Sequence, residues 1–192
     1  MKTRTFDALS APMCDVKGEW LVFYYFIRAA VSFIWVGAAV TTGSILPFAA
    51  AALIIFYPAW DAAASFLDAY RHGGMNCNPV LSMNAILSLV ATIGIAVALS
   101  VSTNSMLAVF GIWAIGSGFL QIATAVRRRK KYGAQWLMIM SGAQSAMAGI
   151  FFLRQAMSGG FYGVSDIVPY AAFGAFYFLV SGIWLVVSQA RQ

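Results

Sequence analysis

The chain alternates long apolar stretches with short polar segments. Each stretch is close to the ~20 residues that an α-helix needs to cross the hydrocarbon core of a bilayer. The pattern therefore predicts an all-α integral membrane protein with six transmembrane helices. Their expected ranges are 20–41, 46–68, 80–101, 105–127, 134–155 and 167–189.

Prolines support these boundaries. Pro47, Pro79 and Pro169 fall at expected helix starts, where a missing backbone N–H removes no hydrogen bond. Pro58 is different because it lies inside the second expected span. It should kink that helix and free a carbonyl one turn earlier.

An internal repeat relates the expected helices in pairs. The segments AVFGIWAIGSGFLQIATAVR (108–127) and AAFGAFYFLVSGIWLVVSQAR (171–191) both carry Phe-Gly near the start and Ser-Gly in the middle. In each, an arginine follows nine residues after the glycine of that Ser-Gly pair. The repeat predicts a segment 1–19 followed by a membrane domain 20–192 of three like-oriented hairpins, at about 20–71, 79–127 and 134–191. Residues spaced by four, such as Ser141, Ser145 and Gly149, indicate faces where helices pack closely.

Composition and charge place the chain in a membrane and orient it. Apolar residues make up 61% of the 192 residues and charged residues 9%, against about 25% charged in soluble domains. Arg154 lies beyond the outer ends of the spans, whereas most other cations lie at the opposite ends, which predicts cytoplasmic N- and C-termini. The cations expected on that inner side are Lys2, Arg4, Lys17, Arg71, Arg127, Arg128, Arg129, Lys130, Lys131 and Arg191. Because these charges flank spans, the net charge of +6 does not indicate a nucleic-acid partner.

The densest basic run has two interpretations. It is typical of a solvated loop that acts as a topology signal, which is the more common case. It also fits contacts with anionic lipid head groups. The candidate head-group contacts are Arg127, Arg128, Arg129, Lys130 and Lys131.

Residues 111–153, GIWAIGSGFLQIATAVRRRKKYGAQWLMIMSGAQSAMAGIFFL, resemble the HdeD-like family of small bacterial inner-membrane proteins. The resemblance covers roughly residues 80–190 and implies six spans, a bacterial inner membrane and, more weakly, a link to acid stress. It brings no catalytic or ligand residues. The residues that carry it are Gly111, Trp113, Ser117, Gly118, the run 127–131, Trp136, Ser141, Gly142 and Gly149.

Charges inside a bilayer are costly and usually paired. By helical rise, Arg28 lies ~12 Å and Asp61 ~13 Å from the inner boundary, on consecutive antiparallel helices. We therefore predict an Arg28–Asp61 ion pair. Asn84, Gln121 and Gln144 fall in the same half of the membrane and complete a candidate polar layer. This layer either holds the bundle together by interhelical hydrogen bonds, which is the more common role, or lines a polar vestibule.

Other polar residues have simpler expectations. His72, between the second and third spans, should be a solvated loop residue. An aromatic belt at the inner interface is expected to include Trp20, Tyr24, Tyr70, Tyr132 and Trp136. Cys14 and Cys77 with one histidine make a poor metal set.

The sequence also lacks a phosphate-binding glycine loop, HExxH, CxxC and a nucleophile elbow. We therefore expect no catalytic residues, cofactor or metal. Three functions remain: a stress-related or structural bundle, a channel or transporter, and an accessory subunit. Membrane lipids, a second copy of the chain and another membrane protein are the possible partners.

Overall fold

The computed structural model describes residues 18–43, 45–130 and 132–191. Within them the chain forms six helices, each long and apolar enough to cross a membrane, which confirms the predicted fold class. The helices are α1 (Gly18–Thr42), α2 (Pro47–Arg71), α3 (Pro79–Leu99), α4 (Thr103–Arg128), α5 (Gln135–Met157) and α6 (Val164–Ala190). Several sequence expectations lie outside the described residues, namely those on the N-terminal segment with its cations and Cys14, and on Lys131.

Local chemistry explains where most helices begin. Pro47 and Pro79 are the first residues of α2 and α3, as predicted. The Ser102 hydroxyl caps α4 by accepting a hydrogen bond from the Ser105 backbone N–H at 3.0 Å. The prediction for Pro169 is wrong, because α6 begins at Val164 and places this proline inside the helix. The Asp166 carboxylate accepts from the Gly163 N–H at 2.8 Å and so stabilises the earlier start.

Pro58 lies within α2, and the helix continues through it. Proline removes one backbone hydrogen bond to the preceding turn. In that turn the Leu53 carbonyl accepts a hydrogen bond from the Trp35 indole N–H at 2.8 Å. A side chain of α1 therefore bonds to the backbone of α2 beside the proline.

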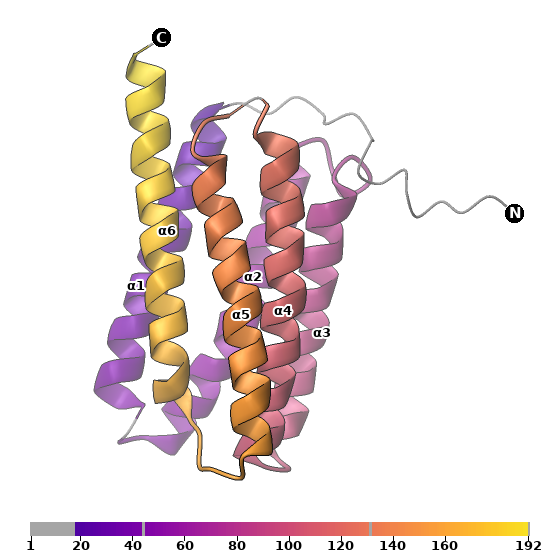
Figure 1. Ribbon diagram of the computed structural model, residues 1–192, viewed down its shortest axis with the longest axis vertical. Helices are drawn as coiled ribbons and strands as arrows, with labels where there is room; N and C mark the ends of the chain where they lie inside the picture. The colour runs from indigo at the N-terminus through magenta and orange to yellow at the C-terminus, as the bar shows by residue number, and fades with distance from the viewer. Residues whose placement is uncertain (1–17, 44, 131, 192) are drawn as a thin grey trace, which may run out of the picture.

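The six helices form a closed ring, and neighbouring helices run antiparallel (Figure 1). Going round the ring, the order is the order of the chain, and α6 packs against α1. The most extensive packing joins α4 to α5, α1 to α6 and α2 to α3, rather than the two helices of any one predicted hairpin. Packing is least extensive between α1 and α2 and between α5 and α6, whereas α3 packs to a similar extent against α2 and α4. The contacts therefore do not alternate regularly around the ring, as three equivalent hairpins would require.

The closest helix pair, α4 and α5, meets backbone to backbone. A Cβ atom added at Gly118 would lie 2.5 Å from the Gly142 carbonyl oxygen, and one added at Gly142 would lie 2.6 Å from that of Gly118. Gly111 and Gly149 approach each other in the same reciprocal way, at 2.8 and 2.5 Å. These positions require glycine because any side chain would push the two backbones apart. The predicted small-residue packing face on α5 is thus confirmed.

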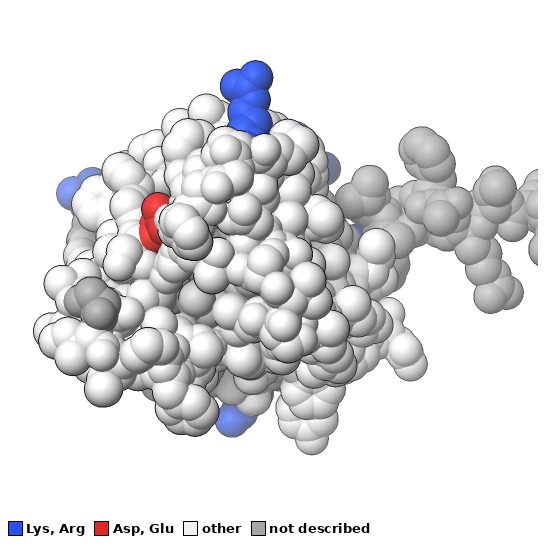
Figure 2. Space-filling model, turned by 90° about the horizontal axis from the view of Figure 1, so that it is seen from below, with Lys and Arg blue, Asp and Glu red and all other residues white. Residues whose placement is uncertain are grey.

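The two ends of the ring differ in charge. At one end lie the start of α1, the end of α6 and the segments 72–78 and 129–134 (Figure 1). We call it the basic end, since Arg71, Arg129 and Lys130 are exposed there. The opposite end carries Gly43, residues 45–46, 100–102 and 158–163, with Arg154 in the last turn of α5 and Asp166 in the first turn of α6. Viewed from below it shows few charged side chains (Figure 2), and we call it the sparsely charged end.

The interior changes character along the same axis. The half toward the sparsely charged end is filled by a cluster of aromatic rings from five helices, packed mostly edge to face. Its members are Trp35, Tyr57, Phe110, Trp113, Phe152 and Tyr170. The half toward the basic end instead contains charged and amide side chains, which form the candidate site.

Candidate functional site: a polar interior

Arg28 of α1 and Asp61 of α2 form an ion pair inside the ring, as predicted. The two side chains are 13% and 7% exposed. A second guanidinium nitrogen of Arg28 donates to the Tyr24 hydroxyl at 2.9 Å. The Arg28 guanidinium carbon also lies 4.4 Å from the centre of the Phe178 ring of α6, at cation–π distance. Arg28 therefore has three kinds of partner: a carboxylate on α2, an aromatic ring on α6 and a hydroxyl one turn earlier on α1.

The second carboxylate oxygen of Asp61 is bound by neutral donors from α3. Asn84 Nδ2 donates to it at 2.7 Å and the Ser88 hydroxyl at 2.8 Å. The Trp113 indole N–H of α4 in turn donates to Ser88 at 2.9 Å. A carboxylate buried in a low-dielectric interior needs donors at both oxygens. The network supplies them from α1 and α3, and Trp113 of α4 holds Ser88 in place.

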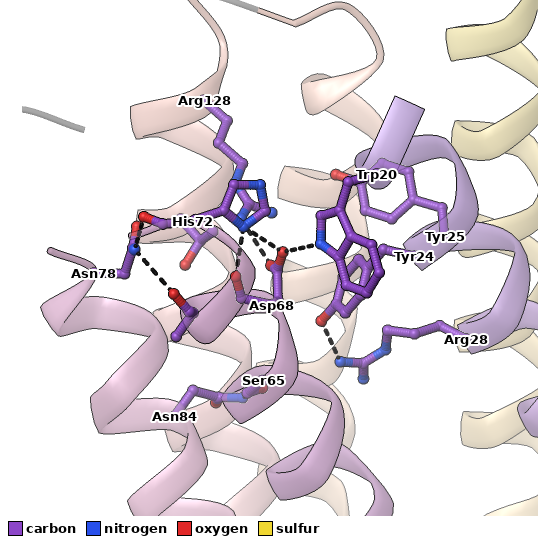
Figure 3. A network of polar contacts seen from close by, with 12 residues as sticks. Trp20, Tyr24, Tyr25, Arg28, Ser65, Asp68, His72, Asn78, Asn84 and Arg128 are labelled. Carbon is purple, nitrogen blue, oxygen red and sulfur yellow. Dashed lines mark hydrogen bonds and ion pairs between the residues drawn. The ribbon is translucent and has the colours of Figure 1, made fainter. Parts of the chain in front are cut away.

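A second buried carboxylate, Asp68, lies two turns closer to the basic end on α2 and is fully buried. Arg128 donates to one of its oxygens at 2.7 Å. The other oxygen lies 2.8 Å from His72 Nδ1 and 3.1 Å from the Trp20 indole nitrogen. Figure 3 shows Arg128, His72 and Trp20 converging on this one side chain from three elements.

The sequence prediction missed Asp68 as a site residue. The signal that could have revealed it is the spacing of Asp61, Ser65, Asp68 and His72 along α2, at intervals of four, three and four residues. That spacing places all four side chains on one face of the helix.

Three sequence expectations near the basic end are wrong. Arg128 is 3% exposed and paired with Asp68, so it is not available to lipid head groups. His72 is 1% exposed rather than solvated, because its segment folds inward and Asn78 Nδ2 donates to its carbonyl at 2.7 Å. Tyr24 is 6% exposed and hydrogen-bonds to Arg28, so it is not part of an interfacial belt. Tyr70 and Trp136 are exposed, as a belt requires, and half-buried Trp20 contacts both Asp68 and Arg71. Within the basic run, Arg129 and Lys130 are exposed and Arg127 is half-buried.

Two adjoining cavities lie along the axis of the ring. The inner cavity, nearer the basic end, has a volume of about 50 Å³ and is lined by residues from Arg28 and Asp61 up to Arg128 and Gln135. The middle cavity, of about 30 Å³, extends from the same ion pair toward Tyr57 and Tyr170. Because Arg28 and Asp61 line both cavities, the ion pair stands at the boundary between them.

The remaining predicted polar residues face these cavities. Asn84 lines the inner cavity, Gln144 the middle cavity and Gln121 both. The Gln121 amide makes long hydrogen bonds, to the Met138 carbonyl at 3.4 Å and to the Met138 sulfur at 3.8 Å. The predicted layer therefore converges, but it surrounds space instead of closing into a continuous hydrogen-bond network.

Some buried polar atoms in this region have no hydrogen-bond partner among the described residues. They include the Nε atoms of Arg28 and Arg128 and the Oδ1 atom of Asn84, all from residues that line the inner cavity. Buried polar groups in folded proteins are nearly always satisfied by protein or by water. A cavity needs a volume of about 10–15 Å³ to hold one water molecule. Both cavities are therefore large enough to hold water molecules that could bond to these atoms.

Residues 83–154 match a family described as a short repeat of unknown function (DUF308), which includes HdeD-like proteins. The match runs from α3 through most of α5 and so contains the glycine contacts between α4 and α5. It thus supports part of the resemblance seen in the sequence. The first two helices, with Arg28, Asp61 and Asp68, lie outside the match. No curated protein and no solved structure matches the chain.

Proposed function

We propose that this multi-pass membrane protein is a non-enzymatic channel or transporter that admits a small polar solute into the cavities at its centre. One observation carries the proposal: all six helices direct polar side chains at two adjoining cavities, beside buried donors without a protein partner. Solute pathways in membrane proteins are marked by such intramembrane polar groups facing a cavity.

The alternative is a purely structural network of interhelical hydrogen bonds. Such a network stabilises a bundle best when every member is satisfied, since an unsatisfied buried polar group is destabilising. The unpartnered Nε atoms of Arg28 and Arg128 and the space beside them favour a role that involves water or a solute.

The arrangement also suggests a direction of access. The inner cavity is lined by polar residues close to the basic end, whereas the aromatic cluster fills the axis toward the sparsely charged end. In this conformation a solute would therefore enter from the basic end and be stopped by the rings of Tyr57, Trp113 and Tyr170.

The positive-inside rule favours a cytoplasmic location for the basic end, with both termini on that side. The resemblance to HdeD-like proteins supports a bacterial inner membrane and acid stress as the setting. We include Arg127, Arg129 and Lys130 in the proposal as contacts for anionic head groups. They lie in the last turn of α4 and just beyond it, at the basic end of the ring.

Flux in proteoliposomes tests the proposal. Vesicles containing the purified protein and protein-free vesicles would be compared for water, potassium, chloride, proton and urea movement. At least one rate should exceed that of protein-free vesicles. Replacing Gln144 by Leu should change that rate, whereas Met147→Leu, on the lipid-facing side of the same helix, should not. If no species crosses faster than in protein-free vesicles, the proposal is wrong.

A further inference from the structure

The middle cavity has a polar lining without net charge. Its charged members, Arg28 and Asp61, are paired with each other. The rest of its polar lining consists of neutral groups that can both donate and accept hydrogen bonds. These are the amides of Gln121 and Gln144 and the hydroxyls of Tyr57, Ser117, Ser141, Ser145 and Tyr170.

This lining disfavours an ion. The Arg28 guanidinium is already bound to Asp61, Tyr24 and the face of Phe178, so it offers no uncompensated charge. An ion entering the cavity would lose its hydration without meeting a counter-charge, which is unfavourable in a low-dielectric interior. An uncharged molecule would exchange hydrogen bonds with water for hydrogen bonds with amides and hydroxyls.

Size restricts the occupant further. At about 10–15 Å³ for each water molecule, the volume of about 30 Å³ corresponds to two or three waters. One wall is backbone, since a Cβ atom added at Gly174 would lie 3.5 Å from the Tyr57 hydroxyl oxygen. A methyl group there would fit without a clash but would take up part of the cavity.

We infer that the middle cavity is a binding site for a small uncharged molecule that both donates and accepts hydrogen bonds, of the size of a simple amide or urea. The inference rests on the proposed function and narrows its solute class. The paired Arg28 and Asp61 form the boundary that such a molecule would pass on its way from the inner cavity.

Three planar solutes of the same skeleton test the inference: urea, guanidinium and nitrate each have a central atom with three neighbours, but their charges differ. In proteoliposomes, urea should cross faster than in protein-free vesicles, while guanidinium and nitrate should not. If none of the three, nor any species in the earlier panel, crosses faster than in protein-free vesicles, the proposed function itself fails. If an ion crosses and urea does not, the proposed function stands and this inference is wrong.

Two glycine substitutions test whether the middle cavity is the binding site. Gly174→Ala should lower urea flux about tenfold, because the added methyl group takes up part of the volume that urea needs. Gly37→Ala is the matched control, because a Cβ atom there meets nothing within 4 Å. Equal urea flux in both variants would overturn the assignment to the middle cavity. If Gly174→Ala does not fold, Gln144→Leu replaces it, with the same loss of urea flux expected.

Discussion

Arg28 and Asp61 are paired inside the ring, yet Asp61 is bound as much by neutral donors as by the arginine. One carboxylate oxygen accepts from Arg28 and the other from Asn84 and Ser88. Asp61 therefore cannot be exchanged for a cation, since an arginine at this position would face the donors of Asn84 and Ser88. Neutral variants that keep the shape of each side chain are the appropriate probes.

Neutralising either partner alone should destabilise the protein more than neutralising both. Asp61→Asn leaves the Arg28 charge buried without its counter-ion, and Arg28→Gln does the same to Asp61, at a cost of about 3–5 kcal/mol each. The double variant should therefore lose less stability than either single variant. Denaturant unfolding of all four proteins in detergent micelles measures this coupling. Additive losses would show that the two residues do not interact.

Asp68→Asn should be as damaging as either of those single substitutions. It would remove the charge that compensates Arg128, whose side chain is 3% exposed, and so cost about 3–5 kcal/mol. The control is Arg129→Gln at the same end of the ring, where the exposed side chain should matter by no more than about 0.5 kcal/mol. Thermal unfolding in micelles compares the two variants. Equal stabilities would contradict the buried pairing of Asp68 with Arg128.

The α4–α5 contact should be intolerant of a single methyl group. Gly118→Ala and Gly149→Ala each place a Cβ atom 2.5 Å from a carbonyl oxygen of the facing helix and should destabilise by about 1–3 kcal/mol. Gly37→Ala on α1 should be neutral or stabilising, since nothing lies near it. Heat-induced loss of the monodisperse peak in size-exclusion chromatography would rank the three. A Gly118 variant as stable as the Gly37 variant would refute the backbone contact.

Trp113→Phe should cost more than about 1 kcal/mol, because it removes the N–H that donates to Ser88 and also part of a buried indole ring. Trp184→Phe is the control, since Trp184 is 49% exposed on α6. Denaturant midpoints of the two variants give the comparison. The hydrogen bond would be unsupported if Trp113→Phe were no less stable than Trp184→Phe.

The sequence allowed the six helices and the Arg28–Asp61 pair to be predicted, for physical reasons. Hydropathy reports directly on which segments can lie in hydrocarbon, and a helical rise of about 1.5 Å per residue converts position into depth. Two charges of opposite sign at one depth on adjacent helices then have few alternatives to pairing. The same arithmetic placed Asn84, Gln121 and Gln144 near them.

Depth does not determine which way a side chain points, and this is why Asp68, His72 and Arg128 were not predicted as a cluster. All three lie at helix ends, where the exposed and the buried orientation are equally compatible with the sequence. The inward fold of the segment 72–78 depends on tertiary hydrogen bonds from Asn78 to the carbonyls of His72 and Gly74. The start of α6 differs from the predicted one for another reason: Asp166 caps the helix by accepting from the Gly163 N–H, and Pro169 then lies inside the helix.

We propose that the polar interior of the ring is hydrated, and water-edited solid-state NMR of the isotope-labelled protein in bilayers tests this most directly. Magnetisation should pass from water to the side-chain amides of Asn84, Gln121 and Gln144 as rapidly as to exposed Arg129. Backbone amides at lipid-facing Ile93 should receive it slowly. If the three interior amides respond as slowly as Ile93, the cavities are dry and the account is contradicted.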